Sequence, residues 1–148
     1  MDQNMSGAPA TPAEFPFLDL RYPHPVRYQG RTFPSAENAY QSTRVSSPAA
    51  IEKFRYMPPG TAAYRGAMCR ADVPGWFASR HDFLYGELAA KYRDRALAAG
   101  LKATGSRPIV IANRRHENDL GACQCPACRG KGRNAMGEIL MQIRAKLL

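Results

Sequence analysis

The segment WFASRHDFLYGELAAKYRDRALAAG, residues 76–100, constrains the fold more than any other part of this sequence. It is the longest stretch with a helical pattern, because its apolar residues return about every 3.6 positions. These residues are Phe77, Phe83, Leu84, Leu88 and Tyr92. Gly100 stands where a glycine commonly ends a helix. We therefore predict one long helix over residues 76–100.

Shorter patterns surround this segment. Residues 25–34, PVRYQGRTFP, alternate around a Gln-Gly pair and predict a β-hairpin. Ser35 and Ser47 are typical N-cap residues, so a helix is expected after each. Residues 107–112 predict a short buried strand, and residues 134–148 an amphipathic helix. The fold class expected is α+β, a single helix-rich domain with a small sheet or hairpin.

The chain start predicts where the folded domain begins. Residues 1–14 are rich in Pro, Ala, Gly and Ser, so we expect a flexible tail there and the domain over residues 15–148. The start lacks the basic and apolar regions of a secretion signal, and no apolar run reaches the roughly 18 residues that cross a bilayer. We expect a cytoplasmic protein without a membrane partner, in which cysteines are thiols or metal ligands.

The charge indicates a class of partner. Lys plus Arg outnumber Asp plus Glu by 21 to 12, which gives a formal net charge of +9. Most of the basic residues are arginines, whose planar guanidinium groups match phosphate oxygens. The charge favours nucleic acid or a phosphorylated ligand as the partner. The alternative is a solvated basic surface with no specific partner.

A cysteine cluster suggests a metal site. Cys123, Cys125 and Cys128 have the close spacing of a zinc loop. A fourth ligand is needed, and the candidates are Cys69, His81 and His116. In the alternative interpretation the thiols simply pack as small apolar groups. A nucleophilic role is disfavoured because no Cys–His constellation is visible. Structural zinc is therefore one hypothesis, and no cofactor is required for chemistry.

The segment GKGRN follows these cysteines and opens the last predicted helix. It comprises Gly130, Lys131, Gly132, Arg133 and Asn134. Asn134 is expected to cap the helix, whose first amides and positive dipole end suit an anion. The alternative is an ordinary basic turn.

Two segments resemble the NADAR family. The first, FLDLRYPHPVRYQGRTFPSAENAYQSTR, is similar to its opening pattern, in which a hairpin is followed by a Glu-x-x-Tyr-Gln helix and a lysine. The second, LKATGSRPIVIANRRHENDLGACQCPACRGKGRNAMGEILMQIR, is similar to its closing pattern, which ends in G-x-G-x-N-x-L-G and a helix. The resemblance covers residues 17–148. It implies an N-glycosidase that cleaves a ribose–base bond of a phosphorylated riboside: an ADP-ribosylated guanine, free or in nucleic acid, or a pyrimidine intermediate.

The resemblance also implies roles for residues of the opening segment. Glu37 matches the family glutamate, and its carboxylate would stabilise an oxocarbenium-like transition state or activate water. Without the resemblance, the alternative is that Glu37 only complements the helix dipole. Tyr40 and Gln41 match the same motif as ligand-binding residues, and Tyr22 would stack on base or ribose. Packing in the core is the alternative for both tyrosines.

In the closing segment, the resemblance implies that the GKGRN residues bind phosphate or ribose. Glu117 stands near the position of the family aspartate, and Asp119 is a second candidate for that catalytic acid.

Several positions depart from the family pattern, and Arg44 matters most. It stands where the family has a lysine that can attack the anomeric carbon, which an arginine cannot do because its pKa stays above about 12. Leu20, Asn38 and Leu120 replace asparagine, histidine and tryptophan. Three functions remain open: an N-glycosidase that uses Arg44 to position other groups, a protein that binds ADP-ribose or a related nucleotide without cleaving it, and a zinc-stabilised module that binds nucleic acid.

Overall fold

The computed structural model describes residues 7–147 and divides into two compact units. The central unit is Leu20–Arg93, and the terminal unit joins Met1–Asp19 to Asp94–Leu148. The chain thus leaves the terminal unit after its first residues and returns to it at Asp94.

The central unit begins with the expected hairpin. Strands β1 (Val26–Tyr28) and β2 (Arg31–Phe33) pair antiparallel, with Val26 opposite Phe33. The turn residues Gln29 and Gly30 both have positive φ angles, 50° and 78°. Two positive φ angles define the tight turn whose twist matches that of the strands, and a glycine adopts one of them without strain.

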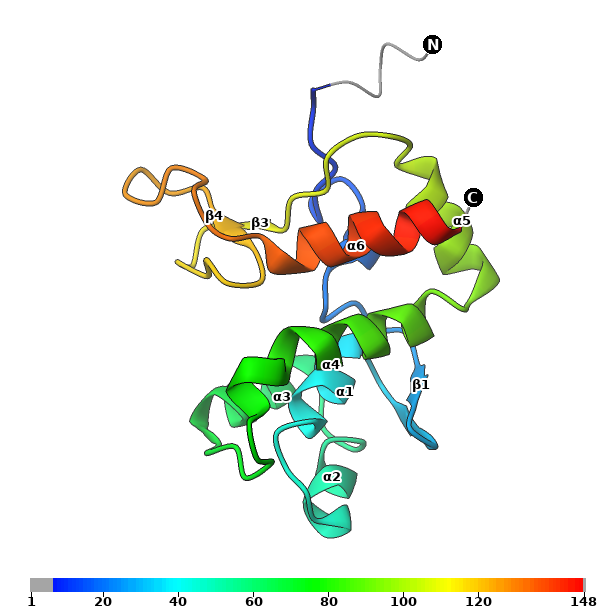
Figure 1. Ribbon diagram of the computed structural model, residues 1–148, viewed down its shortest axis with the longest axis vertical. Coiled ribbons are helices and arrows are strands. Elements are labelled where there is room, and N and C mark those ends of the chain that lie inside the picture. Colours follow the sequence, from blue (N-terminus) through cyan, green and yellow to red (C-terminus); the bar gives the residue numbers. More distant parts are fainter. Residues whose placement is uncertain (1–6, 148) are drawn as a thin grey trace. The chain divides into compact units, whose positions relative to one another are not determined.

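Four helices complete the central unit: α1 (Ala36–Ser42), α2 (Pro48–Lys53), α3 (Pro59–Met68) and α4 (Trp76–Lys91). The first two begin as predicted, because the hydroxyls of Ser35 and Ser47 accept the backbone amides of Asn38 and Ala50. All seven residues of α1 are buried. This helix contacts α3, α4 and the hairpin, and Figure 1 shows α4 running past it. Because α1 carries glutamate, asparagine and glutamine, its burial places polar groups in the core.

The terminal unit is built from a 3-10 turn η2 (Pro16–Leu18), helices α5 (Arg95–Ala103) and α6 (Ala135–Lys146), and two short parallel strands. The strands are β3 (Ala112–Asn113) and β4 (Ala122–Cys123). Its core contains buried side chains from η2, α5, α6 and the segment before β3. These are Leu18, Leu101, Ile109, Met136 and Leu140. Figure 1 shows the long loops that surround β3 and β4 before α6 begins.

The predicted helix over residues 76–100 is wrong in its length. It is two helices, because Tyr92 ends α4 and Asp94 caps α5 by accepting the amide of Leu97 at 2.9 Å. The apolar period continues across the break, but the short carboxylate offers the backbone a cap that starts a new helix. Gly100 lies inside α5 instead of ending it, and a side chain there would press on the Phe17 ring. Phe77, expected in the core, is 70% exposed.

The first residues also differ from the expected tail. Residues 1–6 of that segment lie outside the described residues. Ala10, however, is fully buried and bridges Ile109 in parallel. The Arg107 guanidinium pairs with Glu14 and donates to the carbonyl oxygens of Ala8 and Pro9. The packed part of the chain therefore begins before residue 15.

The predicted strand over 107–112 is mostly irregular, and only its end enters β3. The fold class is α+β, as predicted. Over residues 7–147, no helix combines the length and apolar character needed to cross a membrane.

Candidate active site

Glu37 is the second residue of the buried helix α1 and is 6% exposed. Its Oε2 accepts a hydrogen bond from Gln41 Nε2 at 2.8 Å, one helical turn later. Its Oε1 lies 3.5 Å from Arg21 Nε. Its backbone amide donates to the carbonyl of Leu20 at 2.8 Å, which ties the helix start to the preceding segment. The carboxylate is therefore held from two sides in a place where little water can screen it.

Arg44 takes part in this hydrogen-bonded arrangement. Its Nε donates to Gln41 Oε1 at 2.6 Å, so the Gln41 amide accepts from the arginine and donates to the glutamate. The guanidinium carbon lies 4.0 Å from the centre of the Trp76 ring. Burial lowers the pKa of Arg44, while nearby Tyr40, Cys69 and Glu37 oppose that shift. We name the series Arg44–Gln41–Glu37 the α1 relay.

Gly66 on α3 makes room for the relay. A Cβ at this position would overlap the side-chain amide of Gln41. The close contact of α3 with α1 therefore fixes where the Gln41 amide lies, and with it the orientation of the Glu37 carboxylate.

Glu87 and Lys91 lie one turn apart on α4 and were missed from the sequence. They are 0% and 2% exposed. Burial raises the pKa of Glu87 well above its usual value, and the charge of Glu37 raises it further while that of Lys91 lowers it. Neither carboxyl oxygen of Glu87 has a hydrogen-bond partner in the described part of the chain. Because Glu87 interacts electrostatically with Glu37 and Lys91, the three belong to one region of the central unit.

Lys91 and the tyrosines complete this region. The Lys91 ammonium lies 5.7 Å from the centre of the Tyr22 ring and 5.4 Å from that of Tyr92. Tyr22 is half-buried, which leaves part of its ring accessible. Tyr40 is 4% exposed and its ring lies 5.9 Å from that of Trp76, so it packs in the core of the unit.

A signal for Glu87 and Lys91 was present in the sequence. They fall on the same helix face as Leu84 and Leu88. Charged residues on such an apolar face are rarely fully buried unless they are paired.

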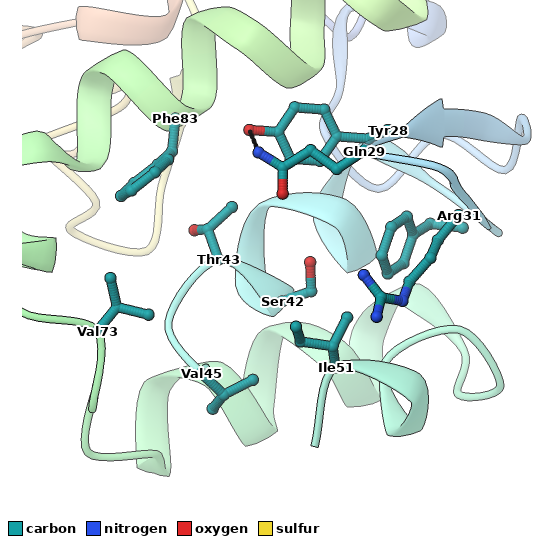
Figure 2. Close-up of a pocket in the computed structure, with 10 residues that line it drawn as sticks. Tyr28, Gln29, Arg31, Ser42, Thr43, Val45, Ile51, Val73 and Phe83 are labelled. Atoms are coloured by element: carbon teal, nitrogen blue, oxygen red, sulfur yellow. Dashed lines mark hydrogen bonds between the residues drawn. The ribbon is translucent and has the colours of Figure 1, made fainter. Parts of the chain in front are cut away.

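A separate hollow of about 210 Å³ opens on the central unit, between the hairpin, the end of α1 and α4. Figure 2 shows Tyr28, Gln29, Thr43 and Phe83 around it. None of the predicted site residues lines it, and its one charged lining residue, Arg31, pairs with Glu52 at 3.2 Å. Without a carboxylate on its wall, this hollow does not offer the groups that glycosidic cleavage needs.

In the terminal unit, Glu117 is committed to the backbone of its own loop. Its carboxylate accepts the amides of Asp119, Leu120 and Gly121 at 3.0, 2.9 and 2.7 Å. Asp119 is half-buried, and its carbonyl accepts the amide of Ala135. The geometry therefore shows Glu117 as a brace for residues 118–121, with both oxygens already engaged.

The start of α6 is occupied by that same loop. The amides of residues 133–136 donate to the carbonyl oxygens of residues 118–121, at 2.8 to 3.0 Å. These are the amides that would have bound an anion, so any ligand at this place would rely on the exposed side chains of Lys131 and Arg133. Through these backbone hydrogen bonds, the end of the GKGRN segment joins the start of α6 to this loop.

Asn134 stands at the N-cap position but does not cap the helix with its side chain. Its backbone is left-handed, with φ 56°. Its side chain instead accepts the amide of Ile111 at 2.9 Å and donates to the carbonyl of Ile109 at 2.9 Å. Gly132 packs so tightly on Asn118 and Gly121 that a side chain there would overlap both.

The three clustered cysteines converge with a histidine. Cys123, Cys125 and Cys128 lie with His116, and their ligand atoms are all within 4.8 Å of one another. Cys69 and His81 belong to the central unit and to no such group among the described residues. The backbone amide of Cys128 helps lower the pKa of Cys125 to about 6, which favours its thiolate.

Comparison with known proteins places this fold and these segments in context. A family model for the NADAR domain matches residues 10–148. The chain belongs to the NADAR family. That family has an N-glycosidase-like fold. The resemblance to the NADAR family seen in the sequence is confirmed. A search of curated proteins gives no match.

The NMR structure of the E. coli protein YbiA is similar to this chain. The two share 23% sequence identity and a TM-score of 0.77, over 97% of this chain and 80% of YbiA. At this identity the likeness establishes the NADAR fold and carries no further assignment of residues.

Proposed function

We propose that this NADAR protein is an N-glycosidase that releases ADP-ribose from ADP-ribosylated guanine, free or in nucleic acid. The observation that carries the proposal is the buried Glu37 carboxylate in the α1 relay. Cleavage of a ribose–base bond builds positive charge on the anomeric carbon, and a carboxylate stabilises that charge. A site with little water strengthens the interaction.

The reaction is a hydrolysis. The bond between the anomeric carbon and the base nitrogen breaks, and its electron pair leaves with the base. The oxygen of a water molecule bonds to the carbon, one water proton goes to Glu37, and Glu37 then gives that proton to the departing base nitrogen, which regenerates the carboxylate. Gln41 and Arg44 act as positioning residues, since their hydrogen bonds hold the carboxylate of Glu37 in one orientation.

Lys91 offers a second route through the same site. Its amine, once neutral, would bond to the anomeric carbon as the base departs, and ring opening would give an imine that water hydrolyses. Two features support it: Lys91 is buried in the same region as Glu37, and Arg44 cannot form such an adduct. Borohydride added during turnover distinguishes the routes, because it fixes an imine as an adduct heavier by reduced ADP-ribose and leaves the water route untrapped. Lys91→Arg should abolish the adduct.

The exposed basic residues support a phosphorylated substrate. Arg114, Arg115, Arg129, Lys131 and Arg133 are all exposed within one segment of the terminal unit. Such side chains bind phosphate oxygens without requiring free backbone amides. If the substrate is nucleic acid, its binding should weaken steeply as salt is raised.

The test is mass spectrometry after incubation with DNA that carries ADP-ribosylated guanine, in parallel with the ADP-ribosylated nucleotide. We expect free ADP-ribose and an unmodified guanine. If neither substrate is cleaved, nor a ribosylated pyrimidine phosphate, the proposal is wrong.

The alternative is a protein that binds ADP-ribose without cleavage, and Arg44 is the observation that favours it. It predicts tight ADP-ribose binding with no turnover by the wild-type chain. Arg44→Lys is the discriminating variant. A gain of activity would mean that the native chain has lost the chemistry, whereas a loss would support Arg44 as a positioning residue.

A further inference from the structure

We propose that His116, Cys123, Cys125 and Cys128 bind one zinc ion in a closed tetrahedral site that holds the loops of the terminal unit together. The proposal does not depend on the N-glycosidase function. It rests on the distances among four side chains and on the hydrogen bonds that surround them.

The distances are those of a tetrahedron. His116 Nδ1 lies 3.4 Å from Cys128 Sγ, 3.6 Å from Cys125 Sγ and 4.0 Å from Cys123 Sγ. With Zn–S near 2.3 Å and Zn–N near 2.05 Å, the edge between nitrogen and sulfur in a tetrahedron is about 3.6 Å. The three separations scatter around this value. The ring therefore faces the sulfurs with Nδ1 and would bind through that atom.

The surrounding groups suit thiolate ligands. The amide of His116 donates to Cys123 Sγ at 3.3 Å, the amide of Cys128 to Cys125 Sγ at 3.4 Å, and Asn118 Nδ2 to Cys128 Sγ at 3.3 Å. Each sulfur thus receives one N–H, which stabilises a negative charge and orients the ligand. The bound group would carry a net charge of −1 from three thiolates and Zn²⁺, and the exposed Arg115 and Arg129 adjoin two of the ligands in the sequence.

The zinc would have a structural role, because the four protein ligands complete its coordination. Three sulfurs and one nitrogen complete a tetrahedron, so no position remains for water or substrate. The four ligands bring together the segment after β3, strand β4 and the turn that follows it. Asn118 links this group to α6, because its side chain contacts Cys128 and its carbonyl accepts the amide of Arg133. The metal would therefore fix the loop on which α6 begins.

His116 itself is held in an unusual conformation. Its φ of 61° is left-handed, which a residue with a side chain adopts at some cost. Because that conformation directs both its amide and its ring toward the sulfurs, metal binding would offset the cost.

The first test is metal analysis of the full chain, purified with zinc in the medium and under reducing conditions. We expect about one zinc per chain, and we expect cobalt to replace it with the visible spectrum of a tetrahedral thiolate site. Cys125→Ser and His116→Ala should each lower zinc affinity at least tenfold. Cys69→Ser, which changes a cysteine outside the cluster, is the matched control and should keep its zinc.

A second measurement needs no variant, so it remains informative if the substituted chains fail to fold. On the wild-type chain, stepwise modification of thiols should release zinc in proportion to the cluster cysteines modified, as followed by a chelating dye. A wild-type chain without zinc would overturn the proposal. So would a disulfide among these cysteines under reducing conditions, or zinc lost equally from Cys69→Ser.

Discussion

The two units hold their functional groups in opposite ways. In the central unit, Glu37, Gln41, Glu87 and Lys91 lie on regular helices, and α1 places Glu37 and Gln41 on the same face. In the terminal unit, the groups of residues 113–134 lie on no helix, and outside two short strands their backbone hydrogen bonds belong to loops and turns. Their positions depend on loop backbone bonds, on side chains such as Glu117 and Asn134, and, we propose, on a metal ion.

This difference indicates how each region should fail. A helix keeps its backbone when one side chain is changed, so a substitution in the α1 relay should affect chemistry more than folding. A loop held by side-chain bonds loses its shape when one of them is removed. Changes in the terminal loop should therefore affect stability and metal binding together.

Apart from the loss of Glu37 itself, the largest effect is expected from metal removal. Chelation of zinc should increase hydrogen exchange of the amides of residues 133–136 by roughly 100-fold or more, because the loop carbonyls that accept them would no longer be fixed. Hydrogen exchange with mass spectrometry measures it. The fluorescence of Trp76, the only tryptophan, reports on the central unit and should change little. Unchanged exchange after complete removal would contradict the metal's structural role.

The next effect concerns the brace in the same loop. Glu117→Ala should destabilise the terminal unit by about 1–3 kcal/mol, because three half-buried amides would lose their acceptor. It should also weaken zinc binding. Denaturant unfolding and metal titration provide the measurements. Glu138→Ala, which removes an exposed carboxylate on α6, is the control, and equal effects of the two changes would refute the bracing role.

In the central unit, the orientation of Glu37 can be changed without changing Glu37 itself. Gly66→Ala should lower kcat about tenfold, because the added methyl group would displace the Gln41 amide that orients Glu37. The helix should remain, since alanine favours helix over glycine. Gly60→Ala on the same helix meets no atom within 4 Å and should leave kcat unchanged. If both variants behave alike, the relay does not set the activity.

The smallest effect is a change in pH dependence. Burial raises the pKa of Glu87, so the folded chain binds this proton more tightly than the unfolded chain does. The resulting stability is present below the ordinary value of 4.5 and is lost as pH rises toward the folded pKa.

Glu87→Gln should therefore make the stability less dependent on pH above 4.5, the range in which the unfolded chain releases this proton and the folded chain keeps it. Urea unfolding followed by Trp76 fluorescence at several pH values measures the slope. Asp82→Asn removes an exposed carboxylate of the same helix and should keep the wild-type slope. Identical slopes for wild type and Glu87→Gln would argue against the buried acid.

Local chemistry made the hairpin, the serine caps and the last helix predictable from the sequence. Each depends on residues close in sequence, such as Gln29-Gly30 or Ser35. The break after Tyr92 was missed because the apolar period continues through it, while a single carboxylate decides the cap. The position of Asn134 was foreseen but not its bonds, which reach the backbone of residues 109 and 111.

The candidate site residues that belong to a sequence motif could be predicted, whereas those that only the fold brings together could not. Glu37 and Gln41 followed from the family resemblance, and their mutual hydrogen bond follows from helical spacing. Three candidates for the fourth metal ligand could not be separated, because only the loop conformation brings His116 to the cysteines. Glu87 and Lys91 belong to no motif; the sequence places them on the apolar face of a helix, but only the fold buries them completely.

The central claim is that the Glu37 carboxylate performs the bond cleavage, and one comparison tests it most directly. Release of ADP-ribose from DNA carrying ADP-ribosylated guanine should be measured for wild type and Glu37→Gln, with circular dichroism and Trp76 fluorescence as controls of folding. We predict that the variant folds and binds ADP-ribose but releases it about 10³-fold more slowly, as expected when a catalytic carboxylate is lost. A folded Glu37→Gln variant that releases ADP-ribose at the wild-type rate would contradict the claim.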